Sequence, residues 1–117
     1  MTTYTDMLEN ATILDVYVYY DGPQLFLAQT DDGKKFLAVS TEDNEDHTVF
    51  LYTEVEPETL AALENNTMDL YTAFRRQEFL GECKDYGTRM EWTAVFSKHI
   101  SDEQLPTPGI FLFIDPP

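Results

Sequence analysis

The sequence has little positive charge and only one cysteine. Of its 117 residues, seven are Lys or Arg and 22 are Asp or Glu, which gives a formal net charge of −15 at pH 7. A field of this sign repels nucleic acid and anionic membranes, so no direct binding to either is expected. Because Cys83 has no second cysteine to pair with, no intrachain disulfide can form, which favours a reducing compartment.

Long apolar runs and targeting signals are also missing. The longest aliphatic and aromatic run, Ile110–Ile114, is far shorter than the roughly 20 residues of a membrane span. The first residues lack the basic and apolar regions of a secretory signal, and we therefore expect a cytoplasmic protein. Hydrophobic residues make up 43% of the chain and aromatic residues 14%, more than acidic disordered tails carry. Residues 1–117 are predicted to form a single folded acidic domain.

Alternating apolar and polar residues predict four strands in the first half of the chain. Asp31-Asp32-Gly33 is a tight hairpin signal between two apolar runs. The connections are short, which is typical of an antiparallel meander. The second and third strands are apolar on both faces and are expected at the centre of the sheet. The four predicted strands are Thr12–Tyr20, Gln24–Thr30, Lys34–Thr41 and His47–Val55.

The periodicity then becomes helical. Pro57 suits the first turn of a helix, and Asn65-Asn66 suits its end. Thr67 or Asp69 is predicted to cap a second short helix, whose last turn is complemented by Arg75-Arg76.

The last third of the chain predicts further strands at Glu78–Cys83 and Thr88–Phe96, around a turn at Asp85–Gly87. One helical turn is predicted at Ser101–Leu105. Gly109–Ile114 has the composition of a buried strand and is flanked by prolines on both sides. The predicted fold class is α+β: an antiparallel β-meander with one or two short helices on one face and further C-terminal strands.

Several stretches have a recognisable order: the strand-turn-strand sequence Val18–Ala28, the strand Lys35–Val39, and the helical segments Leu60–Leu63 and Met68–Phe74. Together they resemble an uncharacterised family of small acidic bacterial proteins, a domain of unknown function. The resemblance covers roughly residues 12–86. It implies an antiparallel sheet with helices. It carries no activity over to this chain, because that family offers no catalytic residues to transfer.

No catalytic, cofactor or metal site is predicted. His47, His99 and Cys83 stand in no nucleophile or acid–base motif, and the five glycines are scattered singly rather than gathered in a phosphate-binding loop. The run Glu42–His47 is the densest group of metal-ligand side chains, but it lacks the spacing, the central Gly and the distal Glu of a calcium loop. It is interpreted as a solvated loop.

The acidic residues are unevenly distributed. Residues 1–70 hold 15 acids against two lysines, and residues 42–58 hold seven acids with no Lys or Arg. This segment is predicted to form one anionic edge able to attract a basic surface. The alternative is that the acids serve solubility alone.

A group of aromatic residues supports an interaction surface. On the first strand, Asp15, Tyr17 and Tyr19 lie on the face opposite Leu14, Val16 and Val18. In one sheet they are expected to share a face with Phe50, Tyr52 and Glu54 of the fourth strand. Tyrosine is enriched at protein interfaces, and carboxylates around it suit an Arg-rich partner. The alternative is that a helix or the C-terminal strands cover this face.

These observations predict a non-enzymatic protein-binding module of the inhibitor, immunity or antitoxin type that docks on a basic partner surface. Two alternatives stay open: a nucleic-acid mimic in phage–host conflict, and an accessory or structural subunit of a larger assembly. The candidate binding residues are Asp15, Tyr17, Tyr19, Glu42, Asp43, Glu45, Asp46, Tyr52 and Glu54.

Overall fold

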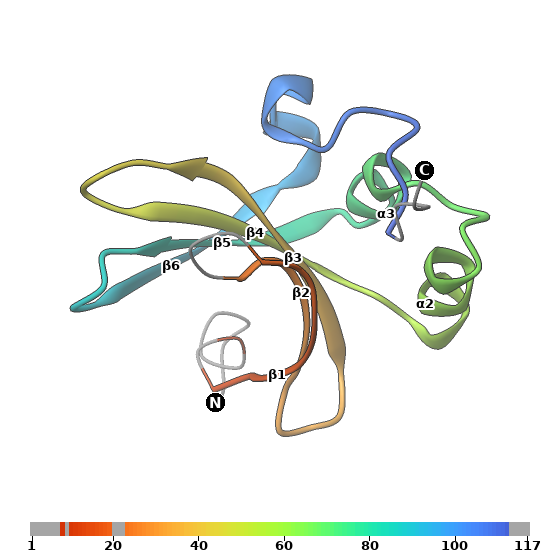
Figure 1. Cartoon of the computed structure of the whole chain (residues 1–117), viewed down its shortest axis with the longest axis horizontal. Coiled ribbons are helices and arrows are strands. Elements are labelled where there is room, and N and C mark those ends of the chain that lie inside the picture. The colour runs from red at the N-terminus through yellow and green to blue at the C-terminus, as the bar shows by residue number, and fades with distance from the viewer. Residues whose placement is uncertain (1–7, 9, 20–22, 113–117) are drawn as a thin grey trace.

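A computed structural model describes residue 8, residues 10–19 and residues 23–112. Six strands form one antiparallel sheet in which each strand pairs with the next along the chain (Figure 1). This order confirms the predicted meander and places the second and third strands inside the sheet. The strands are β1 (Thr12–Tyr19), β2 (Pro23–Gln29), β3 (Lys35–Asp43), β4 (Thr48–Glu54), β5 (Phe79–Asp85) and β6 (Met90–Phe96).

The hairpin between β2 and β3 forms where the Asp-Asp-Gly signal predicts it. Gly33 adopts a φ of 91°, a left-handed conformation that costs glycine little. The turn is closed by the Gly33 N–H, which donates to the Thr30 carbonyl at 2.9 Å, and by the Thr30 N–H, which donates to the Lys34 carbonyl at 2.9 Å.

Two short helices follow β4, as predicted: α2 (Pro57–Glu64) and α3 (Leu70–Arg76). Pro57 stands in the first turn of α2, where its missing N–H is not needed. Asp69 caps α3 by accepting the Thr72 N–H at 2.9 Å, and its other carboxylate oxygen accepts the Gly109 N–H at 2.8 Å. These hydrogen bonds lower the pKa of Asp69 and fasten the C-terminal segment to the start of α3.

The sheet has an apolar cluster on each of its two faces. The helix-covered face carries Leu27, Leu37 and Leu51, which pack against Leu63 of α2 and Phe74 of α3. The opposite side, which we call the aromatic face, is dominated by large rings. Its buried or half-buried rings are Phe26, Phe36, Phe50, Tyr52 and Trp92.

The segment after β6 differs from its prediction. Two 3-10 turns, η1 (Ser97–His99) and η2 (Asp102–Gln104), follow the strand, and η2 confirms the predicted helical turn. Residues 109–112 form no strand: Ile110 is 47% exposed and Phe111 is 37% exposed, whereas Leu112 is buried. The Ile110 carbonyl instead accepts the Leu70 N–H at 2.9 Å, so this part of the segment is bound to the start of α3 rather than paired in the sheet. Residues 113 and 114 of the predicted strand lie outside the described residues.

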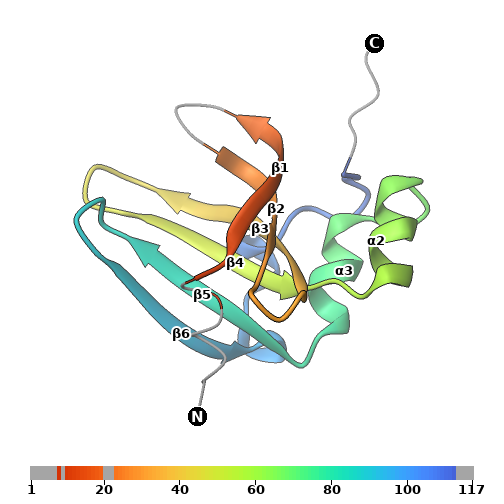
Figure 2. The ribbon, with the colours of Figure 1, turned by 90° about the horizontal axis from the view of Figure 1, so that it is seen from below.

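The two long hairpins end at the same side of the molecule. The tips of β3–β4 and β5–β6 lie side by side at one end, and α2 and α3 lie towards the other (Figures 1 and 2). The described helices include none long and apolar enough to cross a membrane.

Candidate functional site

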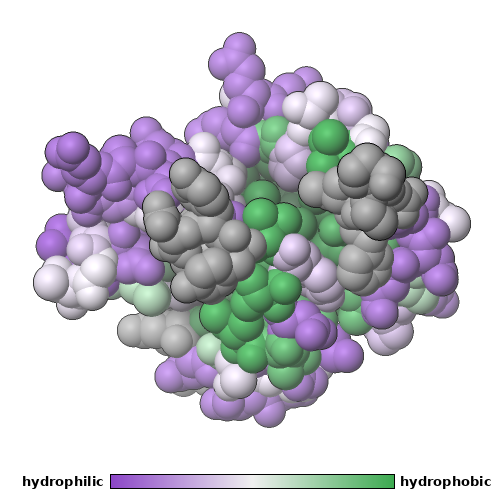
Figure 3. Space-filling view, in the orientation of Figure 1, coloured by the Kyte–Doolittle hydropathy of each residue, from purple (hydrophilic) through white to green (hydrophobic). Residues whose placement is uncertain are grey.

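The tip of the β3–β4 hairpin carries four acidic side chains, all exposed. We call this set, Glu42, Asp43, Glu45 and Asp46, the acidic tip. Figure 3 shows strongly hydrophilic atoms over the β3–β4 tip, paler ones over the β5–β6 tip, and exposed apolar atoms near the centre of the view. Within the part of the chain that the structure describes, the only ion pair of the acidic tip joins Glu42 to His47, at 3.6 Å. The four carboxylates therefore present largely uncompensated negative charge to solvent.

Local hydrogen bonds give the acidic tip a fixed shape. The Asn44 side-chain oxygen accepts the N–H groups of Asp46 at 2.9 Å and of His47 at 3.0 Å. Asp43 accepts the Thr48 hydroxyl at 2.9 Å. An Asn side chain that bonds the backbone two and three residues ahead holds a turn in place. The acids are thus displayed on an ordered loop.

The neighbouring turn between β5 and β6 adds one basic group that is already engaged. The Arg89 guanidinium lies 4.2 Å from the ring centroid of Tyr86 and 3.5 Å from a carboxylate oxygen of Glu91. The Tyr86 ring in turn lies 5.2 Å from the His47 ring, which connects the two hairpin tips. Arg89 therefore offsets Glu91 rather than the acidic tip.

Beside the acidic tip, the aromatic face opens into a small pocket of about 180 Å³. Its floor is made by rings, with Phe26 and Phe50 in edge-to-face contact at 5.6 Å between centroids. At its edge, Ile13 is 47% exposed and Met90 is 53% exposed. Asp85 also lines it. Cross-strand pairing puts Asp43, Thr48, Asp85 and Met90 in one row, so the acidic tip and the pocket are neighbours.

The predicted aromatic surface is wrong in its grouping. Tyr17 packs against the helix-covered cluster, whereas Tyr52 belongs to the opposite face. The cause is a β-bulge: the pairing of β1 with β2 shifts between Ile13 and Asp15, which moves Asp15 beside Leu27 on the helix-covered side. Burial raises the pKa of Tyr17, with further increases from the carboxylates of Asp15 and Glu64.

Two other predicted residues are also not on an exposed binding face. Tyr52 is only 8% exposed and packs against the rings of Phe26 and Trp92, so it belongs to the core, and burial raises its pKa. Glu54 is half-buried at the far end of β4. The side chain of Tyr19 lies outside the described residues.

The single anionic edge predicted for residues 42–58 is not formed. The seven residues of β4 separate the acidic tip from the later acids, and an extended strand of that length spans about 20 Å. At the far end, Glu54 and Glu56 line a pocket together with Lys34 and Lys35, so charges of both signs meet there. Of residues 42–58, all of which the structure describes, the acidic tip is the part that concentrates one sign of charge.

The cysteine and the two histidines have different surroundings. Cys83 is 1% exposed, and burial together with Asp85 raises the pKa of its thiol to about 12, so it is a protonated core residue at neutral pH. His99 lies against the Phe96 ring at 5.4 Å, far along the chain from His47. Across the described ranges, no group of three or more His, Cys, Asp or Glu is arranged to hold a metal ion.

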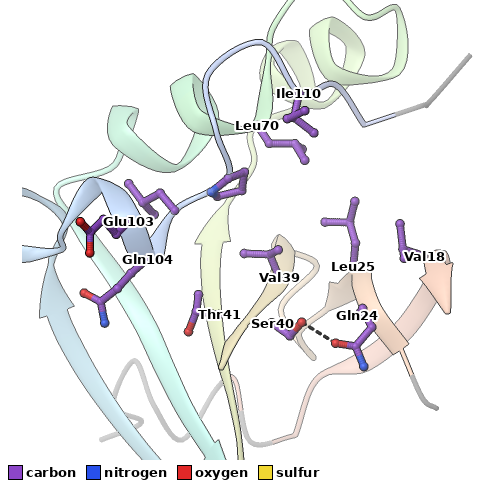
Figure 4. A pocket seen from close by; sticks show the side chains of 12 residues that line it. Val18, Gln24, Leu25, Val39, Ser40, Thr41, Leu70, Glu103, Gln104 and Ile110 are labelled. Carbon is purple, nitrogen blue, oxygen red and sulfur yellow. Dashed lines mark hydrogen bonds between the residues drawn. The ribbon is translucent and has the colours of Figure 1, made fainter. Parts of the chain in front are cut away.

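A second pocket, of about 300 Å³, lies between the sheet and the C-terminal segment (Figure 4). Val18, Leu25 and Val39 form its apolar side, and Ile110 comes from the segment opposite. Its polar groups are partly engaged, because Ser40 donates a hydrogen bond to the Gln24 side-chain oxygen. Sequence patterns did not indicate this pocket, since it depends on a long-range contact of residues 103–110.

Sequence reasoning also missed the role of Arg75. It was expected to complement the end of α3, but its guanidinium donates to the Ile100 carbonyl at 2.8 Å and also contacts Asp102. The Tyr71 hydroxyl donates to the same Asp102 carboxylate at 2.8 Å. The hydrogen bonds from Arg75 and Tyr71 lower the pKa of Asp102. This network fastens η1 and η2 to α3 and is structural.

The comparisons with known proteins agree with the fold-level resemblance. A model of a family of unknown function, DUF6575, matches residues 3–116. The chain belongs to this family. The match extends beyond residues 12–86, where the resemblance was seen, and includes the C-terminal segment. Neither a curated protein nor a solved structure matches the chain.

Proposed function

We propose that this member of DUF6575 is a non-enzymatic binding module that docks on a basic surface of another protein. The observation that carries the proposal is the acidic tip: four exposed carboxylates within five residues, held on an ordered loop. Opposite charges on two proteins speed their association by steering the encounter. The remainder of the −15 charge contributes a weaker, more diffuse attraction.

The pocket beside the acidic tip supplies the second half of the proposal. Charge attraction alone gives fast but short-lived encounters, whereas buried apolar contacts slow dissociation. Ile13 and Met90 expose apolar side chains at the pocket edge, and Asp85 provides a carboxylate next to them. A basic partner with an apolar or Arg side chain is the best match, because an Arg stem packs on apolar surface while its head reaches a carboxylate.

The test compares two quadruple charge reversals that change the net charge equally. One variant replaces the acidic tip by lysine, and the other replaces four exposed acids elsewhere. We expect the wild type and the second variant to retain a partner from lysate of the source cells. The first variant should not retain it. Equal retention by all three proteins would contradict a role for the acidic tip. The four control positions are Asp31, Glu56, Glu64 and Glu103.

A further inference from the structure

The two outer strands of the sheet differ in how open their edges are. The pairing of β1 with β2 shifts register at three places, and such bulges make an edge a poor template for another strand. β6 pairs with β5 over seven consecutive residues without a shift. It contains no Pro or Lys and a single charge, Glu91, so it lacks the usual devices that protect an edge.

The hydrogen bonds at the two ends of the β5–β6 ladder show which backbone groups of β6 point outward. The Tyr86 N–H donates to the Arg89 carbonyl at 2.9 Å, and the Ser97 N–H donates to the Glu78 carbonyl at 2.8 Å. Antiparallel pairs alternate between bonded and non-bonded positions. Every second residue of β6, beginning with Met90, therefore turns its N–H and C=O away from β5. These residues are Met90, Trp92, Ala94 and Phe96.

The same four residues direct their side chains to the aromatic face. Met90 is 53% exposed and Phe96 is 37% exposed, and the Phe96 ring lies 4.5 Å from that of Phe79, itself 45% exposed. The indole N–H of Trp92 is buried and has no acceptor among the residues described. Outward backbone groups and exposed apolar side chains thus occur together along one strand.

The charge of the residues around β6 indicates which kind of partner binds this edge. Residues 78–99 carry four acids and three bases, whereas the remaining 95 residues carry eighteen acids and four bases. A nearly neutral edge offers little attraction to a basic partner. Two strongly acidic molecules also repel each other less through this edge than through the acidic tip.

The sequence of β6 is self-complementary in an antiparallel arrangement centred on Thr93. In this register Trp92 lies opposite Ala94 of the second copy, and Met90 lies opposite Phe96 of the second copy, so all four outward residues form bonded pairs. Glu91 lies opposite Val95 of the second copy, so no like charges face each other directly. The antiparallel arrangement also points the two acidic tips in opposite directions.

We propose that two copies of this chain pair through their β6 edges, around a two-fold axis through Thr93, into one continuous antiparallel sheet. Each outward residue donates one backbone hydrogen bond and accepts one across the axis. The interface is isologous, so it closes at two copies and does not propagate. This pairing is independent of the proposed binding function. It uses the nearly neutral β6 edge, whereas the binding function uses the strongly negative acidic tip.

The first test uses the residue on the axis. A non-bonded antiparallel pair brings its Cα atoms to about 4.5 Å, within the range that a disulfide spans. We expect oxidised Thr93→Cys to form a covalent dimer rapidly, while Thr72→Cys on α3, whose position is also exposed, does so only slowly. Equal rates for the two variants would overturn the proposal.

The second test blocks the edge without disturbing β5. Because the Ala94 N–H points outward, proline at this position removes no bond within the sheet. Sedimentation should show a dimer for the wild type and a loss of dimer for Ala94→Pro, with circular dichroism and unfolding midpoint retained. A wild type that stays monomeric at about 0.5 M salt, where repulsion is screened, overturns the proposal. So does a dimer that persists in folded Ala94→Pro, because another surface must then form it.

Discussion

The β3–β4 and β5–β6 hairpins lie side by side but use their side chains in opposite ways. On the aromatic face, β3–β4 buries Phe36 and Ala38 completely, while at its acidic tip Glu42 alone of the four described acids has an ion-pair partner. β5–β6 balances its charges and leaves Met90 and Phe96 exposed. One hairpin therefore combines a core strand pair with a charged end, and the other offers an apolar edge. The two hairpins thus carry the two proposed surfaces: a charged tip for a basic partner and an apolar edge for a second copy.

The largest expected effect is the difference in stability loss between a substitution in the core and one at the sheet edge. Phe36→Ala should lower the free energy of unfolding by about 3–5 kcal/mol, because it removes a ring that is 0% exposed and leaves a cavity. Phe96→Ala, on the exposed edge, should cost about 1 kcal/mol or less. Urea unfolding of both variants measures the difference. Similar losses would mean that the edge of the aromatic face is as well packed as its centre.

A second prediction concerns the apolar edge of the pocket. Ile13→Ser should raise the dissociation rate of the partner by about tenfold with little change in association, since burying one apolar side chain contributes more than 1 kcal/mol. Leu14→Ser is the matched control, because Leu14 is 43% exposed but does not line the pocket. The same loss in both variants would remove the pocket from the mechanism. Surface-immobilised kinetics provide the measurement.

Salt should act on the two surfaces in opposite directions. Binding of a basic partner should weaken by several-fold as the Debye length shortens from about 10 Å at 0.1 M to about 3 Å at 1 M. Pairing of two acidic copies should strengthen over the same range, because the repulsion between them is screened. Sedimentation and partner titration at matched salt concentrations test this. If both change in the same direction, the two surfaces are not electrostatically distinct.

The smallest expected effect comes from Asp102. Its pKa is lowered in the folded state by Arg75 and Tyr71, so its stabilising contribution is present above the unfolded pKa of about 3.9 and is lost as pH falls through the lower folded value. In Asp102→Asn, the free energy of unfolding should therefore fall slightly less steeply as the pH is lowered. Thermal unfolding between neutral pH and about pH 3 shows this. A steeper acid dependence in the variant would contradict the assignment.

Local patterns predicted the fold well because they depend on near neighbours. The Asp31–Gly33 turn, the Pro57 start of α2 and the Asp69 cap of α3 all formed where the sequence indicated. The boundaries of the six strands also lay within a few residues of their predictions.

The site was predicted only in part because it depends on tertiary contacts. A bulge after Ile13 reversed the alternation that had grouped Tyr17 with Tyr52, and bulges leave little trace in a single sequence. Arg75 reached Ile100 instead of its own helix end, and residues 109–112 were bound to the start of α3 instead of being paired in the sheet. The acidic tip was identified because a hairpin loop displays its side chains whatever the rest of the chain does.

The most direct test of the account is the association rate of the purified partner, measured against salt concentration for the wild type and the two charge-reversal variants. Lysines at the acidic tip should remove most of the salt dependence and slow association by about tenfold or more at low salt. Equal reversals elsewhere should leave most of the association rate and most of its salt dependence unchanged. Equal slowing by the two variants would show that net charge alone governs the encounter, and would contradict a localised docking site at the hairpin tip.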